Sequence, residues 1–179
     1  MEYANCDYAI ATLARGLKEK EIAQKYMERS RNWQNLWNPD VESLGFKGFV
    51  WPRYSDGSWW SENDYSVFQG GTWPDFVYET FSWELSFYVP HDVNALIEKW
   101  DQRWYMGLFQ ISNEPGFLTP TLYNYVGRPD KTAEVVRKTL KERYNTTKEG
   151  IPGNDDSGSM SSWYVFHALG FYPNTGQDL

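Results

Sequence analysis

Two amphipathic segments open the chain and predict a helical hairpin. Apolar residues recur at helical spacing over residues 2–17 and again over residues 19–37. Gly16 is a stop signal near the end of the first segment, and Asn38-Pro39 ends the second because the residue before proline avoids helical geometry. A short turn joins the two segments, so we expect antiparallel neighbouring helices.

The middle of the chain differs in composition and lacks the helical periodicity of the first segments. Residues 43–63 mix glycine with aromatic residues, which predicts a loop or short β-ribbon, and Asp56-Gly57 is a hairpin-turn signal. The aromatic run 79–89 is compatible with a buried helix or a strand. A further helix is expected after Pro90, with Asp92 in its first turn.

The C-terminal third again has helical periodicity. Residues 128–144 carry a buried stripe with charged residues outside it, and residues 159–169 form an apolar helix stopped by Gly170. About seven helices joined by short loops predict an all-α fold of helical hairpins, with the ribbon or loop of residues 43–63 as an insertion.

Composition adds an unusual abundance of aromatic residues. The 179 residues include 10 Trp, 13 Tyr and 10 Phe, so 18% of the residues are aromatic, well above the usual content of a soluble protein. The length is that of one ordinary domain. Most of these rings are expected in the core. Four tryptophans in predicted loops are better candidates for ligand contact, because loops place side chains at the surface. These are Trp51, Trp59, Trp60 and Trp73.

The charge balance narrows the classes of partner. The net charge of −7 disfavours binding to nucleic acid or to anionic membranes. No apolar run approaches the roughly 20 residues of a transmembrane helix, and the first residues do not resemble a secretory leader. The single cysteine, Cys6, cannot form an internal disulfide.

An acidic loop, Gly153-Asn154-Asp155-Asp156-Ser157-Gly158, is the strongest local signal for chemistry. Its two carboxylates could cap the following helix, bind a hard cation or hold a water for attack. Taken alone, the loop favours capping. Asn113-Glu114-Pro115 has a similar explanation, because an acidic residue at a helix start interacts favourably with the helix dipole.

Two glutamates lie in the aromatic segment, where burial would raise the pKa of either carboxyl and make a general acid. These are Glu79 and Glu84, although a solvent-facing glutamate is the commoner outcome. His91 at a helix start and His167 inside the last helix have no nearby partners for a zinc site. The sequence contains no phosphate loop, dinucleotide fingerprint or nucleophile elbow.

Several short motifs, taken in order, resemble glycoside hydrolase family 92. The resemblance extends over nearly the whole chain. The motifs are Glu2-Tyr3-Ala4, Glu79 through Asp92, Asn113-Glu114-Pro115, Leu122-Tyr123-Asn124-Tyr125, Lys131-Thr132, Gly153 through Ser161, Trp163-Tyr164-Val165 and Ala168 through Pro173.

The resemblance implies a calcium-dependent, inverting exo-α-mannosidase, of the α-1,2 type, that processes N-glycans and is secreted. The family combines an N-terminal β-sandwich with a C-terminal (α/α)6 barrel, or toroid. Residues 1–179 would then be the later part of that barrel, and the missing remainder of the catalytic domain would be a partner along with mannose-containing glycans. The isolated chain is expected to be poorly active.

The resemblance also assigns roles to residues. Glu79 matches the general acid and Asp156 the general base, with Asp155 counted among the catalytic residues. Asn113 and Glu114 match the segment around the sugar and Ca²⁺. The residues expected to contact substrate are Trp83, Glu84, His91, Asp92 and Asn154.

Two alternatives remain open from the sequence. Phe81 stands where many members of the family have asparagine, and its ring would crowd a sugar subsite. A degenerate carbohydrate-binding module without turnover is therefore the alternative function. A purely structural helical domain is the third possibility, and it predicts neither binding nor turnover.

Overall fold

The computed structural model describes residues 1–61, 66–68, 77, 80–99, 109 and 111–173. The chain divides into two compact units, Met1–Arg103 with Thr175–Leu179, and Trp104–Asn174. Glu79 and Trp73, both singled out above, lie outside the described residues. The described part is mostly helical and includes one two-stranded sheet, whose second strand lies within the ribbon or loop predicted for residues 43–63.

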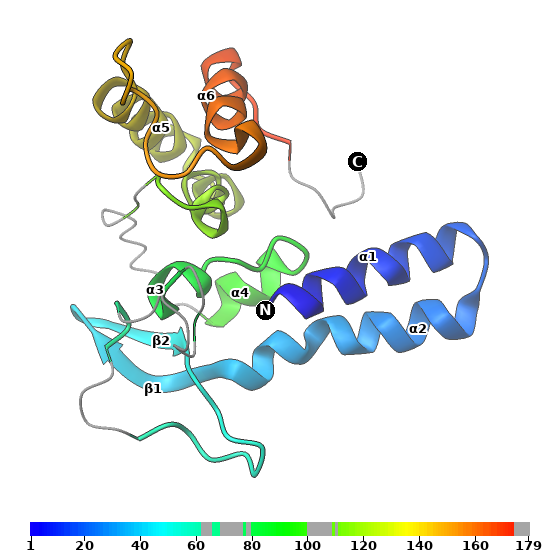
Figure 1. Cartoon of the computed structure of the whole chain (residues 1–179). Helices are drawn as coiled ribbons and strands as arrows, with labels where there is room; N and C mark the ends of the chain where they lie inside the picture. Colours follow the sequence, from blue (N-terminus) through cyan, green and yellow to red (C-terminus); the bar gives the residue numbers. More distant parts are fainter. Residues whose placement is uncertain (62–65, 69–76, 78–79, 100–108, 110, 174–179) are drawn as a thin grey trace. The chain divides into compact units, whose positions relative to one another are not determined.

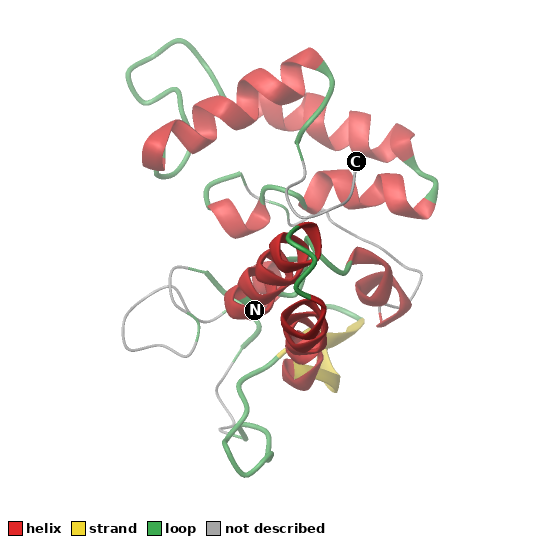
Figure 2. Cartoon of the chain, turned by 90° about the vertical axis from the view of Figure 1, so that its right-hand side faces the viewer, coloured by secondary structure: helices red, strands yellow, loops and turns green. Residues whose placement is uncertain are grey.

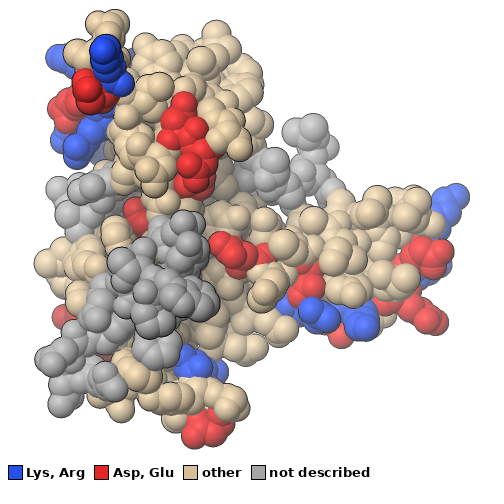
Figure 3. Space-filling model, viewed as in Figure 1, with Lys and Arg blue, Asp and Glu red and all other residues tan. Residues whose placement is uncertain are grey.

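The first unit begins with the predicted hairpin, formed by α1 (Glu2–Gly16) and α2 (Lys20–Arg29). Figures 1 and 2 show the two helices side by side. Small side chains on α1 allow this close approach, since Ala4, Ala11 and Ala14 are buried. No residue of α2 is buried. In Figure 3 acidic and basic side chains alternate along the surface of the hairpin of α1 and α2.

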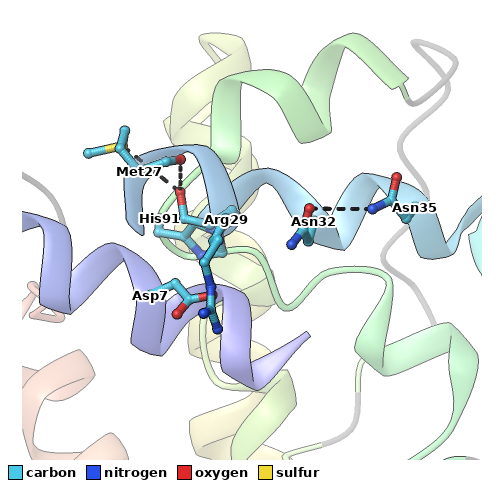
Figure 4. Close-up of polar contacts among 7 residues, drawn as sticks. Asp7, Met27, Arg29, Asn32, Asn35 and His91 are labelled. Carbon is cyan, nitrogen blue, oxygen red and sulfur yellow. Dashed lines mark hydrogen bonds and ion pairs between the residues drawn. The ribbon is translucent and has the colours of Figure 1, made fainter. Parts of the chain in front are cut away.

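One ion pair joins the two helices of the hairpin. Nε of Arg29 lies 3.1 Å from Oδ2 of Asp7, whose side chain is only 9% exposed (Figure 4). A buried carboxylate without a partner is costly, so Arg29 compensates for the burial of Asp7. The pair fixes the C-terminal end of α2 against the first half of α1.

The second predicted helix is too long. After α2 the backbone tightens into a 3₁₀ helix, η1 (Ser30–Leu36), and then becomes strand β1 (Trp37–Ser43), which pairs with β2 (Phe46–Val50). Leu44 and Gly45, at φ 52° and 80°, form the two-residue turn between the strands. The predicted segment therefore overlaps strand β1 only at Trp37, which pairs with Val50, and its second half is a 3₁₀ helix rather than an α-helix.

The Asp56-Gly57 turn is confirmed as a separate local feature. Gly57 has φ 90°, and the Tyr54 amide donates to the Ser58 carbonyl at 2.9 Å. Arg53 and Trp59 form an isolated antiparallel β-bridge on either side of the turn. The Asp56 carboxylate closes the turn by accepting hydrogen bonds from the Ser58 amide and hydroxyl.

Two short helices complete the described part of the first unit, α3 (Ser82–Leu85) and α4 (Val93–Lys99). The aromatic run is therefore helical for one turn only, and the helix after Asp92 is confirmed. Trp83 of α3 is the centre of an aromatic cluster and is 4% exposed. Its ring contacts those of Phe46, Phe49, Phe68 and Phe87.

The second unit contains η2 (Glu114–Gly116), η3 (Thr119–Val126), α5 (Pro129–Arg143), η4 (Asp156–Gly158) and α6 (Ser159–Leu169). Gly127 and Gly170 end η3 and α6 in the left-handed conformation, as the stop signals predicted. The core consists of Ile111, Phe117, Met160 and Trp163. The indole N–H of Trp163 donates to the carbonyl of Phe117 at 3.1 Å and so joins α6 to the segment after η2.

No helix among the described residues is both long and apolar enough to cross a membrane.

Candidate active site

The acidic loop enters α6 through an unusual backbone path. Gly153, Ser157 and Gly158 all have positive φ, at 62°, 53° and 75°. Gly153 lies directly against the backbone of Ser112, where a Cβ atom would come within 2.7 Å of the Ser112 Cα. The start of the loop therefore contacts the residue just before Asn113 and Glu114.

Asp155 caps helix α6. Its Oδ1 accepts a hydrogen bond from the Ser161 amide at 2.9 Å, and its Oδ2 accepts one from the Ser161 hydroxyl at 2.7 Å. The bonds from the amide and then from the hydroxyl lower the pKa of Asp155, because both stabilise the charged form. Of the three explanations for the loop, capping is therefore correct for Asp155.

Asp156 has a different environment from its neighbour. Its side chain is exposed, and no described residue donates a hydrogen bond to its carboxylate. Asn154 is exposed as well. An exposed carboxylate with unused acceptor capacity is able to hold and deprotonate a water.

Glu114 of η2 is joined to α6 by a hydrogen bond. Its Oε1 accepts a hydrogen bond from the Ser159 hydroxyl at 2.8 Å, and both residues are half-buried. Asn113 immediately precedes η2 in an extended conformation. The residues that the sequence placed in separate motifs, Asn113-Glu114 and the acidic loop, are thus close together at the start of α6.

The donor atoms of this region fit a hard cation by type. Carboxylate and amide oxygens of Glu114, Asn113 and Asn154 are the ligands that Ca²⁺ prefers. Among the described residues no group of three or more His, Cys, Asp or Glu side chains could hold a metal. A cation here would therefore depend on amide, carbonyl or substrate oxygens in addition to Glu114.

The predicted substrate contacts in the first unit have structural partners. Trp83 is a core residue, and Glu84, 9% exposed, accepts a hydrogen bond from the Thr80 hydroxyl at 2.8 Å. Asp92 accepts a hydrogen bond from the indole N–H of Trp33 at 3.0 Å. These contacts explain the three side chains as packing or positioning groups, and their contact with substrate stays a prediction.

His91 is half-buried against the helical hairpin. Its Nε2 lies 3.0 Å from the Ser30 carbonyl oxygen, and the centroid of its ring is 5.7 Å from that of Tyr8. Burial lowers the pKa of His91. The ring therefore remains neutral near pH 7 and joins the start of η1 to the segment before α4. Its contact with substrate likewise stays a prediction.

Two serines of the site were missed by sequence reasoning. Ser159 and Ser161 occupy the first and third positions of α6 and bind Glu114 and Asp155. The sequence did contain a capping signal, because an acidic residue precedes the helix, but that signal does not identify which residue donates the hydrogen bond to it. Hydroxyl partners at these positions depend on the fold of the loop, which three positive φ angles determine.

Comparison with known proteins decides the family. The profile of the glycosyl hydrolase family 92 catalytic domain matches residues 1–179. This chain belongs to glycosyl hydrolase family 92. The predicted resemblance is confirmed, and the hydrolase relatives do not favour the alternative of a carbohydrate-binding module.

The family 92 chain is similar to longer proteins. It is 36% identical over 201 residues to an uncharacterized secreted glycosidase of Arthroderma benhamiae, covering 100% of this chain and 26% of that protein. The chain thus spans about a quarter of the length of this relative.

Two solved structures share its fold. The family 92 α-mannosidase BT3965 from Bacteroides thetaiotaomicron matches with a TM-score of 0.81 and 28% identity, over 98% of this chain and 24% of that one. The family 92 inverting mannosidase BT2199 from the same organism matches with a TM-score of 0.79 and 27% identity, over 98% and 27%.

Proposed function

We propose that the protein containing this family 92 chain is an inverting α-mannosidase, with Glu79 as general acid and Asp156 as general base. Family membership supports hydrolysis of a glycosidic bond. The α-mannosidase BT3965 and the inverting mannosidase BT2199, whose folds are similar, support the substrate and the stereochemistry. The chain would contribute the later helices of an (α/α)6 barrel.

The difference between Asp155 and Asp156 is the observation that carries the proposal. Both oxygens of Asp155 are occupied by Ser161. Asp156 is exposed at the start of η4, and its carboxylate accepts no hydrogen bond from a described residue. The two hydrogen bonds from Ser161 lower the pKa of Asp155 and hold its carboxylate against the helix, which makes it a weaker base, so Asp156 is the better candidate of the two.

The chemistry follows from two carboxyl groups on opposite sides of the sugar ring. Asp156 takes a proton from a water as the water oxygen bonds to the anomeric carbon, and Glu79 gives its proton to the departing glycosidic oxygen. The bond to the leaving group breaks and the configuration inverts. A pair of this kind requires a separation of about 6.5–9.5 Å, which leaves room for the water.

We further propose that Asn113 and Glu114 hold Ca²⁺, and that the substrate is a terminal α-1,2-linked mannose of an N-glycan. When bound, the cation would ligate vicinal sugar hydroxyls and fix the ring. The Ser159 hydroxyl would keep the Glu114 carboxylate in place through its bond to Oε1. Secretion of the parent protein is supported by its relative, which is called a secreted glycosidase.

The test uses the full parent enzyme and an α-mannoside. Asp156→Asn and Glu79→Gln should each lower kcat by at least about 100-fold, the usual contribution of general acid-base catalysis. Glu149→Gln, an exposed acid in the same unit, is the matched control and should leave kcat unchanged. Proton NMR of the first product should show β-mannose. Near-normal turnover by Asp156→Asn, or α-mannose as first product, would overturn the proposal.

A further inference from the structure

Ser161 links the acidic loop to helix α6, whose first turns pack in the core of the second unit. Its neighbours on α6, Met160 and Trp163, are fully buried. The Tyr144 hydroxyl donates to the Met160 carbonyl at 3.1 Å, which adds a contact from beyond α6. The start of α6 is therefore held by the core of the second unit, while the loop before it is exposed.

The connection between loop and helix is made twice by one residue. The amide and the hydroxyl of Ser161 bind different oxygens of Asp155, so the carboxylate can neither rotate nor withdraw without losing a bond. The Gly158 amide also donates to the Asp155 carbonyl at 2.9 Å. Asp155 is thus held by its side chain and by its backbone.

Asp156 lies between this anchor and a constrained backbone. Ser157, the next residue, has φ 53°, in the left-handed region that side chains other than glycine rarely adopt. Such a conformation persists only where its surroundings determine it. The anchored Asp155 on one side and the start of α6 on the other are the surroundings that the structure provides.

We propose that Ser161 is a positioning residue of the active site, which holds Asp155 and thereby fixes the direction in which Asp156 presents its carboxylate. The inference rests on the proposed role of Asp156 as general base. It assigns Asp155 to orientation rather than to proton transfer. Ser159, two residues earlier on α6, makes a similar contact with the Asn113-Glu114 motif, because its hydroxyl donates a hydrogen bond to Glu114.

A helix cap that only stabilises α6 would have a different kinetic consequence. Loss of a cap lowers the unfolding temperature but leaves the folded enzyme with its normal kcat. Loss of a positioning contact lowers kcat in the folded enzyme, because small displacements of a reacting group have large effects on rate. The KM should change little, since the base does not bind the ground-state sugar.

The experiment compares three serine variants of the full parent enzyme on an α-mannoside. Ser161→Ala removes only the hydroxyl bond, and kcat should fall about 10-fold with KM within about 2-fold. Ser161→Thr keeps a hydroxyl and should restore kcat. Ser162→Ala, an exposed neighbour, is the matched control and should behave as wild type.

A second variant protects the test against misfolding of Ser161→Ala. Asp155→Asn keeps the shape of the side chain and weakens its bonds to Ser161, so kcat should again fall while circular dichroism remains native. Wild-type kcat in either folded variant, or no recovery with Thr, would overturn the inference. Asp156→Asn is assayed in parallel: if it retains turnover, the proposed base is wrong, whereas its inactivity beside a fully active Ser161→Ala refutes only the positioning role.

Discussion

Gly153 and Gly158 offer a matched pair that tests the packing of the acidic loop. Both have positive φ, at 62° and 75°, so alanine at either position costs about 1–2 kcal/mol through the left-handed backbone alone. The two glycines differ in their surroundings. A Cβ on Gly158 has no described atom within 4 Å, whereas one on Gly153 overlaps the backbone of Ser112.

The overlap determines the size of the expected difference. The Ser112 Cα and carbonyl carbon would each lie 2.7 Å from the new Cβ, closer than real Cβ atoms come. Backbone atoms must move to relieve it, and overpacking of this kind typically costs about 1–3 kcal/mol. We therefore expect Gly153→Ala to destabilise the protein by about 2–5 kcal/mol and Gly158→Ala by about 1–2 kcal/mol.

Equilibrium unfolding of the parent protein in denaturant, followed by tryptophan fluorescence, measures the difference. The Gly153→Ala midpoint should be the lower of the two, with an unchanged slope. Equal midpoints, or a lower midpoint for Gly158→Ala, would show that the loop does not pack on Ser112 as described. Gly170→Ala, at φ 91° and with open space around it, is a second control for the backbone term.

Three further outcomes are expected. Burial lowers the pKa of His167 below its usual 6.5, so below about pH 6.5 the unfolded chain binds more protons and stability should fall as pH drops toward the folded pKa. His167→Gln should reduce this dependence in chemical unfolding and leave the similar contribution of buried His91. Chelation with EDTA should abolish turnover of the parent enzyme and added Ca²⁺ should restore it, whereas full activity after exhaustive chelation would contradict a calcium role for Asn113 and Glu114. The isolated 179-residue chain should lack turnover and self-associate in light scattering, because apolar side chains such as Tyr3 and Leu13 are 84% and 65% exposed; a monodisperse, active monomer would disprove this.

The acidic loop shows how far local sequence signals reach. Capping and general-base chemistry were both readable from two adjacent carboxylates beside glycines. The assignment of capping to Asp155 required the position of Ser161, which is six residues away and separated from Asp155 by two residues of positive φ, Ser157 and Gly158. Sequence spacing alone does not reveal such a turn.

Aromatic side chains show the same division. Trp83 is a tryptophan close in sequence to the proposed acid and was therefore expected to bind sugar. In the structure four phenylalanine rings contact its ring, those of Phe46, Phe49, Phe68 and Phe87. Three of these contacts come from residues at least 15 positions away in the chain. Burial by distant residues is not encoded in local periodicity, so the sequence could propose a role for the ring but not its environment.

The sequence by itself determined the family, the helices with strong periodicity and the positions where glycine ends them. Helices α1, α5 and α6 follow from patterns within a few turns, because helical hydrogen bonds join residues four apart. Only the tertiary structure decided that the chain after η1 becomes strand β1, and that Ser161 binds the carboxylate of Asp155 while no described residue donates a hydrogen bond to that of Asp156. Both outcomes depend on contacts that local periodicity does not specify, namely the pairing of Trp37 with Val50 and the hydrogen bonds from Ser161 to a carboxylate six residues earlier.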